Sequence, residues 1–439
     1  MLSNLLEIVP KNRSKYLTGK EIIEGILSGV IKPSGVLERC FEAIERYEPM
    51  IGAWSVLDMD NALKRAISLD TKVIEGILHG VPIGIKDNID TSNMATQYGT
   101  NLYPNYTPAR DSACVASLLM ADAIALGKTV CTEFAHRAPG KTTNPWNVLC
   151  SPGGSSSGSA AAVSSGMVPI SIGTQTTGSV IRPAAYCGVI GYKPTFGVFN
   201  VSGVLANTPS FDTLGFFSRC IEDLILIRKA ILDKSIPSLS KIDLRNAKVG
   251  IARNPYWNNT SPSYHKMLEI VASTLSKAGA KITEFHGNGA FENLEEIGTS
   301  ISGYEFARTL THERRCFYDQ LSPVLRDGRM ADGINIVYSD YVSSLQRIEK
   351  ARIKLDFAIS EVDFVICPSA PGPAPEGLHE TGSAALNMAW TWLHAPVVTL
   401  PVALDDETQL PLGLQMVGRR HGDDKLLSYA DAVFNELIK

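Results

Sequence analysis

The stretch SPGGSSSGSAAAV, residues 151–163, places three consecutive serines, Ser155 to Ser157, between glycines and leads directly into alanines. A glycine and serine tract is usually a flexible linker. The alternative is a catalytic loop that enters a buried helix. The small residues Ser159 to Met167 can form a closely packed helix, and VPISIG after them is typical of a buried strand.

Two further stretches bear on this choice. HGVPIGIKDNID, residues 79–90, has a short apolar run between a glycine and a polar turn, which predicts a buried strand with Lys86 at its end. TQTTGSVIRPAAYCG, residues 174–188, predicts a turn that holds Ser179, followed by the start of a second helix. Each stretch would carry a polar side chain from a buried element into a loop.

The rest of the chain alternates helical and strand patterns. Helices are predicted at 36–47, 112–126, 265–279 and over most of 288–360. Strands are predicted at LGKTV (126–130), AKVGIAR (247–253), AKITEFH (280–286), DFVICPSAPGPAP (363–375), APVVTLPVAL (395–404) and LPLGLQMVG (410–418). No long linker divides this pattern, so we expect one large α/β domain over residues 1–439.

Composition and charge exclude several classes of protein. The chain has 439 residues, a hydrophobic content of 44% and a formal net charge of −4, which favours neither nucleic acid nor an anionic membrane as a partner. We find no apolar run long enough to span a membrane, and residues 1–16 lack the features of a secretory signal. We expect a cytoplasmic protein whose eight scattered cysteines are reduced, mostly buried thiols rather than a zinc site.

Lys86, Ser155 and Ser179 together suggest nucleophilic catalysis. The usual base is histidine, but none of the eight histidines lies in a nucleophile motif, and we expect His136, the one nearest the serine tract, not to be the base. A lysine can replace histidine if burial keeps it neutral. Lys86 would then accept a proton from Ser155, and Ser155 from Ser179, whose oxygen would attack a carbonyl carbon.

The order GIKDNID, PGGSSSGSAAAV, GTQTTGSVIRPAAYCG strongly resembles the amidase signature family. LGKTVCTEFA (126–135), NPWN (144–147), GYKPTFG (191–197), SFDTLGFFSR (210–219) and PLGLQMVGR (411–419) extend the resemblance over most of the chain. The serines at 155 and 179 are 24 residues apart, as the family's relay serine and nucleophile are. By this resemblance the serine tract is a catalytic loop and not a linker.

The resemblance implies a role for each of these residues. Lys86 would be the catalytic lysine, Ser155 the relay serine after a cis peptide bond with Gly154, and Ser179 the nucleophile that becomes acylated. The backbone N–H groups of Thr176, Thr177 and Gly178, with that of Ser179, would form the oxyanion hole. The implied reaction is hydrolysis of a carboxamide to an acid and ammonia or an amine, with no metal and no organic cofactor.

The implied fold is a large mixed β-sheet covered by helices on both sides. The chain would divide into an N-terminal helical segment at about 1–70, a catalytic core at about 71–235, a region that varies in the family at about 236–360 and C-terminal core strands at about 361–439. The pattern departs from the family's common T-D-T-G-G-S-I-R turn at Gln175, Thr177 and Arg182. We expect these changes to affect a buried ion pair and the oxyanion site, not the nucleophile.

The substrate and the assembly are open at this level. The stretch at 196–215 favours a free-standing amidase that acts on a small or medium amide. One alternative is the amidase subunit of a glutamine-dependent amidotransferase. Others are a hydrolase of urea derivatives such as allophanate or biuret, and a non-catalytic binding protein with this fold. A homodimer is the commonest assembly for soluble enzymes. Pocket walls are expected from 97–140 and from beyond 300, with Tyr98, Phe134, Gly154, Tyr304 and Trp390 as candidate substrate-binding residues, although core packing is the usual fate of an aromatic side chain.

Overall fold

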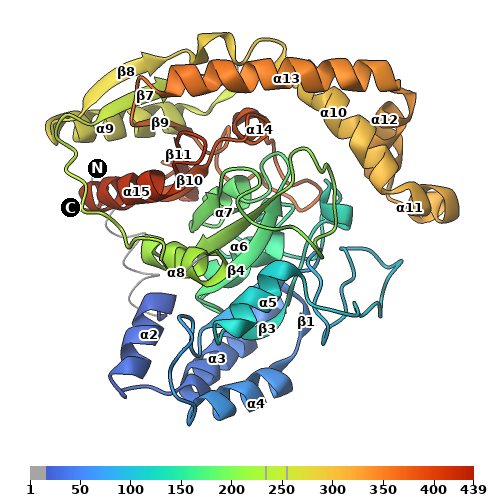
Figure 1. The fold of residues 1–439 in the computed structure, drawn as a ribbon, viewed down its shortest axis with the longest axis vertical. Coiled ribbons are helices and arrows are strands. Elements are labelled where there is room, and N and C mark those ends of the chain that lie inside the picture. The colour runs from blue at the N-terminus through green and yellow to red at the C-terminus, as the bar shows by residue number, and fades with distance from the viewer. Residues whose placement is uncertain (1–15, 233–234, 254–255) are drawn as a thin grey trace.

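A computed structural model describes residues 16–232, 235–253 and 256–439 (Figure 1). Residues 1–15 lie outside the described part. The expectation that residues 1–16 are not a secretory signal therefore concerns a segment that is almost entirely undescribed. Among the described residues, no helix combines the length and the apolar sequence that crossing a bilayer requires.

The described residues form one 11-stranded sheet. Its strands are β1 (Trp54–Leu57), β2 (Pro82–Lys86), β3 (Ile124–Thr129), β4 (Ile170–Gln175), β5 (Ile190–Lys193), β6 (Thr213–Ser218), β7 (Lys248–Ala252), β8 (Lys281–Phe285), β9 (Phe364–Pro368), β10 (Val397–Leu404) and β11 (Pro411–Val417). Their order across the sheet is β1-β3-β2-β4-β6-β5-β10-β11-β9-β7-β8. Strands β3, β2 and β4 are parallel neighbours, as are β9, β7 and β8. Antiparallel strands connect these two groups, so the sheet is mixed, as expected.

The helices connect these strands and cover the sheet. They are α2 (Gly19–Leu27), α3 (Pro33–Ile51), α4 (Met59–Leu69), α5 (Ala113–Met120), α6 (Ser157–Ser164), α7 (Ile181–Tyr186), α8 (Ile221–Ile231), α9 (Pro262–Lys277), α10 (Leu294–Thr309), α11 (Thr311–Cys316), α12 (Ala331–Asn335), α13 (Tyr338–Ile359), α14 (Ala385–Trp392) and α15 (Asp423–Leu437). Helices α10 and α13 lie at one end of the molecule, and α2, α3 and α4 lie at the other (Figure 1).

Alternating strand side chains build a core on each face of the sheet, because successive residues of a strand point to opposite faces. Phe216 packs in a cluster with side chains of α5, α8, α9 and α15. Its neighbour Phe217 belongs to a second cluster with α3, α4 and α6. Further along the sheet, Phe364 joins the first cluster, whereas Val365 packs with α10, α13 and α14. The expected helical layers on both faces are therefore confirmed.

Several local predictions differ from the structure. The sequence analysis did not predict strands β1, β5 and β6, of which β1 lies within the N-terminal segment expected to be helical, and the strand predicted at 363–375 ends at Pro368. The helix predicted at 112–126 ends at Met120, and β3 begins at Ile124. The physical reason lies at Asp122, whose φ of 66° is incompatible with a continuing right-handed helix. The chain turns there and pairs as a strand between β1 and β2.

Candidate active site

The site lies where two parallel strands end. Lys86 is the last residue of β2, and Thr174 and Gln175 end the neighbouring strand β4. Because the strands are parallel, their carboxyl ends meet at one edge of the sheet, where α/β proteins commonly bind ligands. Ser155 lies in the loop before α6, a helix that packs on β2, β3 and β4. Three segments that are distant in sequence thus converge at this edge.

The amine of Lys86 sits between two residues of that edge. Its Nζ lies 2.7 Å from Ser155 Oγ and 2.8 Å from Thr174 Oγ1, with the carbonyl oxygen of Thr174 at 3.4 Å. Asn88 Nδ2 donates a hydrogen bond of 3.1 Å to the same threonine hydroxyl. A neutral amine has two N–H donors and one lone pair. With its hydrogens directed to Thr174, the lone pair of Lys86 is free to accept a hydrogen bond from Ser155.

Burial shapes the protonation of this lysine. The Lys86 side chain is fully buried, and within the described part of the chain no carboxylate oxygen lies within 4.0 Å of its nitrogen. Burial lowers the pKa of Lys86 from 10.5 to about 8, because an ammonium loses its hydration there, while Cys131 and the more distant Asp212 oppose this shift. The site therefore holds an amine that can give up its proton near neutral pH.

The serine tract is a buried part of the fold. Every residue from Ser151 to Ser165 is buried, so the linker interpretation is wrong. The peptide bond between Gly154 and Ser155 is cis, as the resemblance implies. The Ser156 hydroxyl donates to the Thr174 carbonyl at 3.2 Å and accepts from the Thr174 N–H at 3.3 Å, and the Ser156 N–H donates to the carbonyl of Ser179 at 3.4 Å. The tract is thereby tied both to the end of β4 and to the turn that follows it.

That turn, residues 176–179, exposes backbone donors. Among the described residues we find no acceptor for the N–H groups of Thr177, Gly178 and Ser179. The turn is held from behind, because Thr176 Oγ1 donates to Asp212 at 2.5 Å and Thr391 Oγ1 donates to the carbonyl of Thr177 at 2.7 Å. Ser179 Oγ likewise has no hydrogen-bond partner in the described part of the chain, so no hydrogen bond joins it to Ser155.

The residues that depart from the common family turn have defined partners. The side-chain oxygen of Gln175 accepts hydrogen bonds from the N–H groups of Val180 and Ile181, at 2.7 and 2.9 Å, and its amide nitrogen donates to Thr391. Arg182 donates to the carbonyls of Gly154 and Gly382. A neutral amide thus holds the start of α7, and the arginine supports the serine tract instead of pairing with position 175. Thr177 does not adopt a left-handed backbone conformation, so its branched side chain is accommodated.

A cavity of about 850 Å³ opens at this turn. Its lining includes Ser179, Thr176, Thr177, Arg182 and residues from α10, α12 and α14. The five candidate substrate-binding residues lie outside this lining. Phe134 and Trp390 are fully buried in core clusters, Tyr98 packs beside Phe134, Tyr304 stacks on Tyr341, and Gly154 is covered, its carbonyl bound by Arg182.

Several cavity residues fall within the expected wall ranges, 97–140 and beyond 300, but were not individually assigned to the pocket from the sequence. His136 lines the cavity beside Phe306, and its pKa is lowered by burial and by Arg329 and Arg137. Both arginines also line the cavity. Arg329 lies in the π-helical turn Leu325–Met330, a stretch without a recognisable motif, and no local signal could have located it. Asp212, which supports the turn, lies within the quoted SFDTLG stretch but had been given no role.

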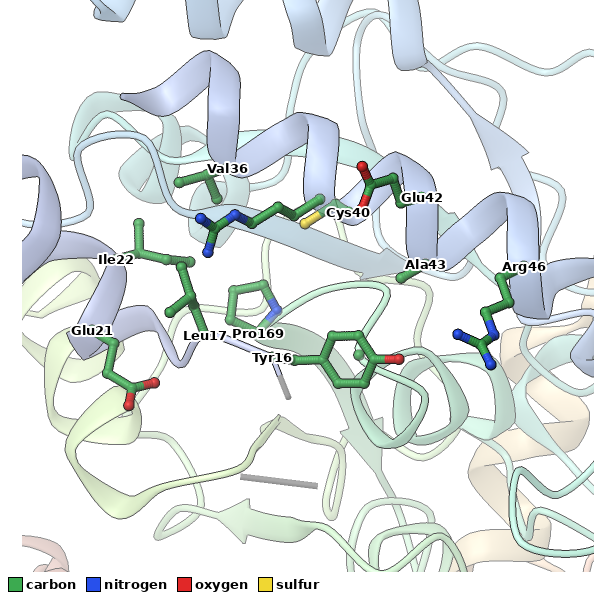
Figure 2. A pocket seen from close by; sticks show the side chains of 12 residues that line it. Tyr16, Leu17, Glu21, Ile22, Val36, Cys40, Glu42, Ala43, Arg46 and Pro169 are labelled. Atoms are coloured by element: carbon green, nitrogen blue, oxygen red, sulfur yellow. The ribbon is translucent and has the colours of Figure 1, made fainter. Parts of the chain in front are cut away.

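A second cavity, of about 520 Å³, lies between α2 and α3 (Figure 2). Tyr16, Glu21 and Arg46 face it, and Pro169 closes it from the segment before β4. Ser179 lines the cavity at the serine turn and not this second one, whereas Lys86 and Ser155 are buried outside both linings. The cavity at the serine turn is therefore the candidate active site.

The mixed sheet with helices on both faces, and the buried lysine beside a serine-rich loop, define the class of amide hydrolases with the amidase-signature fold. The chain belongs to the amidase family: the family's model, described as Amidase, matches residues 35–427.

Relatives and solved structures agree with this assignment. The chain is 30% identical to a glutamyl-tRNA(Gln) amidotransferase subunit from Endomicrobium trichonymphae, in an alignment covering 94% of this chain and 95% of the relative. A solved amidase structure is 26% identical, with a TM-score of 0.86 and coverage of 94% and 98%. The native peptide amidase from Stenotrophomonas maltophilia shares the fold, with a TM-score of 0.83 at 24% identity over 97% of this chain and 98% of the amidase.

Proposed function

We propose that the chain hydrolyses the carboxamide of a small or medium linear amide through Lys86, Ser155 and Ser179. The observation that carries this proposal is the 2.7 Å contact between Lys86 Nζ and Ser155 Oγ. The amine is buried, and no carboxylate of the described residues lies within 4.0 Å of it. A lysine in such a setting can act as a base, whereas an ion-paired lysine would stay protonated.

The proton moves in a balanced cycle. Ser179 Oγ attacks the amide carbon while its proton passes to Ser155, and the proton of Ser155 passes to Lys86. The tetrahedral intermediate collapses when the leaving nitrogen takes a proton back along the same path, which releases ammonia or an amine and leaves an ester on Ser179. Water, deprotonated through the same pair, then attacks this ester; as the acyl–oxygen bond breaks, the proton returns to Ser179 Oγ, which releases the carboxylic acid and restores the enzyme. The contact between Ser179 and Ser155 would close in the substrate complex, as catalytic hydrogen bonds often do.

The turn at 176–179 would stabilise the oxyanion. Its N–H groups at Thr177, Gly178 and Ser179 have no acceptor among the described residues, and a well-placed donor contributes about 3–4 kcal/mol to the stability of the transition state. Thr176 belongs to the same expected set, and its hydroxyl fixes the turn on Asp212.

An active-site label tests this function. A fluorophosphonate should modify the wild-type protein at Ser179, the Ser179→Ala variant should stay unlabelled, and ammonia release from an amide panel should follow the same pattern. Equal labelling of both proteins would contradict the assignment of Ser179 as the nucleophile, and no labelling of either protein would favour a non-catalytic binding protein. Urea derivatives belong in the same panel, since turnover of allophanate or biuret alone would favour that class of hydrolase.

A second candidate function is the amidase subunit of a glutamine-dependent amidotransferase. The observation in its favour is the 30% identity to the Endomicrobium trichonymphae amidotransferase subunit over nearly the whole chain. The two functions use the same three residues and differ in their need for a partner. A free-standing amidase should hydrolyse amides at full rate as a purified single chain, whereas a subunit should hydrolyse glutamine efficiently only in its complex.

A further inference from the structure

Asp212 lies beside the turn that holds Ser179. It immediately precedes strand β6, whose first residue, Thr213, pairs with Gln175 at the end of β4. The register of these antiparallel strands therefore brings Asp212 next to Thr176, the first residue of the turn. The side chains meet there, with Thr176 Oγ1 donating to Asp212 Oδ1 at 2.5 Å.

Both oxygens of the Asp212 carboxylate accept hydrogen bonds. Oδ1 accepts from Thr176, and Oδ2 accepts from the backbone N–H groups of Asn207 and Thr208 at 2.6 and 2.8 Å. Burial raises the pKa of Asp212 from its ordinary 3.8, whereas these three bonds and the charge of Arg329 oppose the increase. Because three donors converge on it, the ionised carboxylate is the form that fits this site.

The loop that carries the carboxylate, residues 207–212, is anchored on its far side. The N–H and hydroxyl groups of Ser210 donate to the carboxylate of Glu305 on α10. The side-chain oxygen of Asn207 accepts a hydrogen bond of 2.8 Å from Arg329. These contacts give the Asp212 carboxylate a defined position from which to hold the turn.

The turn depends on such contacts, because its oxyanion donors do not hold themselves in place. The backbone N–H groups of residues 177–179 have no acceptor among the described residues. Two hydroxyl contacts flank them, from Thr176 to Asp212 and from Thr391 to the carbonyl of Thr177. Only the first ends on a charged group, and such bonds are roughly twice as strong as neutral ones. Donors stabilise an oxyanion best when their orientation is fixed before the reaction.

We propose that Asp212 is a positioning residue: its carboxylate, acting through the Thr176 hydroxyl, holds the turn at 176–179 in the geometry that receives the oxyanion. This inference rests on the proposed function, since it assumes that an oxyanion forms at this turn. The charge of Asp212 also raises the pKa of Lys86, which favours the ammonium that forms when the proton reaches that lysine.

Replacing Thr176 tests the contact directly. Thr176→Val keeps the branched shape but removes the hydroxyl, so kcat and kcat/KM should both fall about 10-fold to 100-fold while KM changes less than about 3-fold. Thr176→Ser restores the hydroxyl and should bring kcat back to within about 3-fold of the wild type. The rate of Ser179 modification by a fluorophosphonate should follow the same order.

Thr213→Val is the matched control. The buried Thr213 hydroxyl lies next to Asp212 in sequence but donates to the carbonyl of Phe211 at 3.0 Å. This variant loses a buried hydrogen bond of the same kind without touching the turn, so kcat should change less than about 2-fold. Urea unfolding of both valine variants separates loss of stability from loss of rate.

Asp212→Asn adds a second readout. An amide has one acceptor oxygen, so it cannot keep all three hydrogen bonds, and kcat should fall at least as far as in Thr176→Val. Loss of the negative charge should also move the midpoint of the kcat/KM profile to lower pH, whereas Thr176→Val should leave the midpoint in place. The other titratable groups around Lys86 are the same in both variants: Cys131, Asp87 and Lys128.

The outcomes separate this inference from the proposed function. Positioning by Asp212 is contradicted if Thr176→Val turns over like the wild type or no worse than Thr213→Val, if serine at position 176 does not restore the rate, or if Asp212→Asn leaves the midpoint unmoved. The two Thr176 variants decide the matter even where Asp212→Asn is too unstable to purify. A wild-type protein that is neither labelled nor active on amides would overturn the proposed function, and this inference with it.

Discussion

At the scale of single residues, Lys86 shows how burial decides chemistry. An ordinary lysine with a pKa of 10.5 is almost entirely protonated at pH 7, whereas a pKa of about 8 leaves about a tenth of the molecules with a neutral amine. Loss of hydration outweighs the more distant Asp212, which acts in the opposite direction. The same residue type at the exposed end of a strand would be only a surface charge.

We predict that kcat/KM rises about tenfold per pH unit below pH 8 and levels off above it, because the base must be deprotonated in the free enzyme. Lys86→Met should lower kcat/KM by a factor of about 100 to 10,000 without loss of the fold. Measuring kcat/KM from pH 6 to 10 checks both, and a flat profile would count against a lysine base.

Lys128 provides the control for this profile. It is also fully buried and its pKa is also lowered to about 8, but its nitrogen bonds the carbonyl of Ile89 and the hydroxyl of Thr96 and neither of the two serines. Lys128→Met should therefore leave the midpoint of the profile in place, even where it lowers stability. A moved midpoint would assign the titration to Lys128 instead.

At the scale of elements, helix α6 positions the serine tract by close approach to the sheet. Its residues are all buried, and the small side chains let the helix backbone lie against β3 and β4. The tightest point is Gly158, where an added Cβ would lie 2.2 Å from the carbonyl oxygen of Ala53 and 2.4 Å from the nitrogen of Val130. The run of serine, glycine and alanine is thus a packing requirement, whatever the role of its serines.

We predict that Gly158→Ala destabilises the protein by about 1–3 kcal/mol or more and lowers turnover. The clash with backbone atoms outweighs the roughly 0.5–1 kcal/mol that alanine adds to helix stability, and it displaces Ser155. Urea unfolding and amide turnover measure the two effects. Gly35→Ala in α3 is the control: apart from its chain neighbours and its own helix backbone, no atom of the described residues lies within 4 Å of the added Cβ. This variant should raise the free energy of unfolding by about 0.5–1 kcal/mol.

At the scale of the whole molecule, one sheet joins segments from both halves of the chain. Strand β10, from the C-terminal region, pairs with β5, and through β5 and β6 it connects to the strands that hold the site. A single core cluster contains side chains from Ile22 to Leu437. Strands from the first half of the chain and the C-terminal strands therefore share both hydrogen bonds and packing.

We predict that the chain unfolds in one cooperative transition, as expected for one domain over residues 1–439. Differential scanning calorimetry should give one peak whose calorimetric enthalpy equals the van't Hoff enthalpy. Two separated transitions would instead divide the chain into independently folding units and contradict the single-domain prediction.

Local patterns predicted much of the fold and part of the site. The apolar run that ends at Lys86 predicted strand β2, and the small residues after Ser159 predicted helix α6, because these features depend on neighbours in sequence. Local patterns could not show which of the aromatic candidates line the substrate pocket and which belong to the core. Phe134 and Trp390 fill cores, and only the packing of distant helices decides which side chains reach a cavity.

The sequence by itself determined the family, the mixed α/β architecture and which lysine and serines to examine, because motif order and hydrophobic periodicity are local properties of the chain. Only the tertiary structure decided that Lys86 is dry, that Thr174 and Asn88 orient its amine, and that Arg329 faces the cavity of Ser179. Burial and charge depend on distances between segments that lie tens to hundreds of residues apart, and folding alone sets those distances.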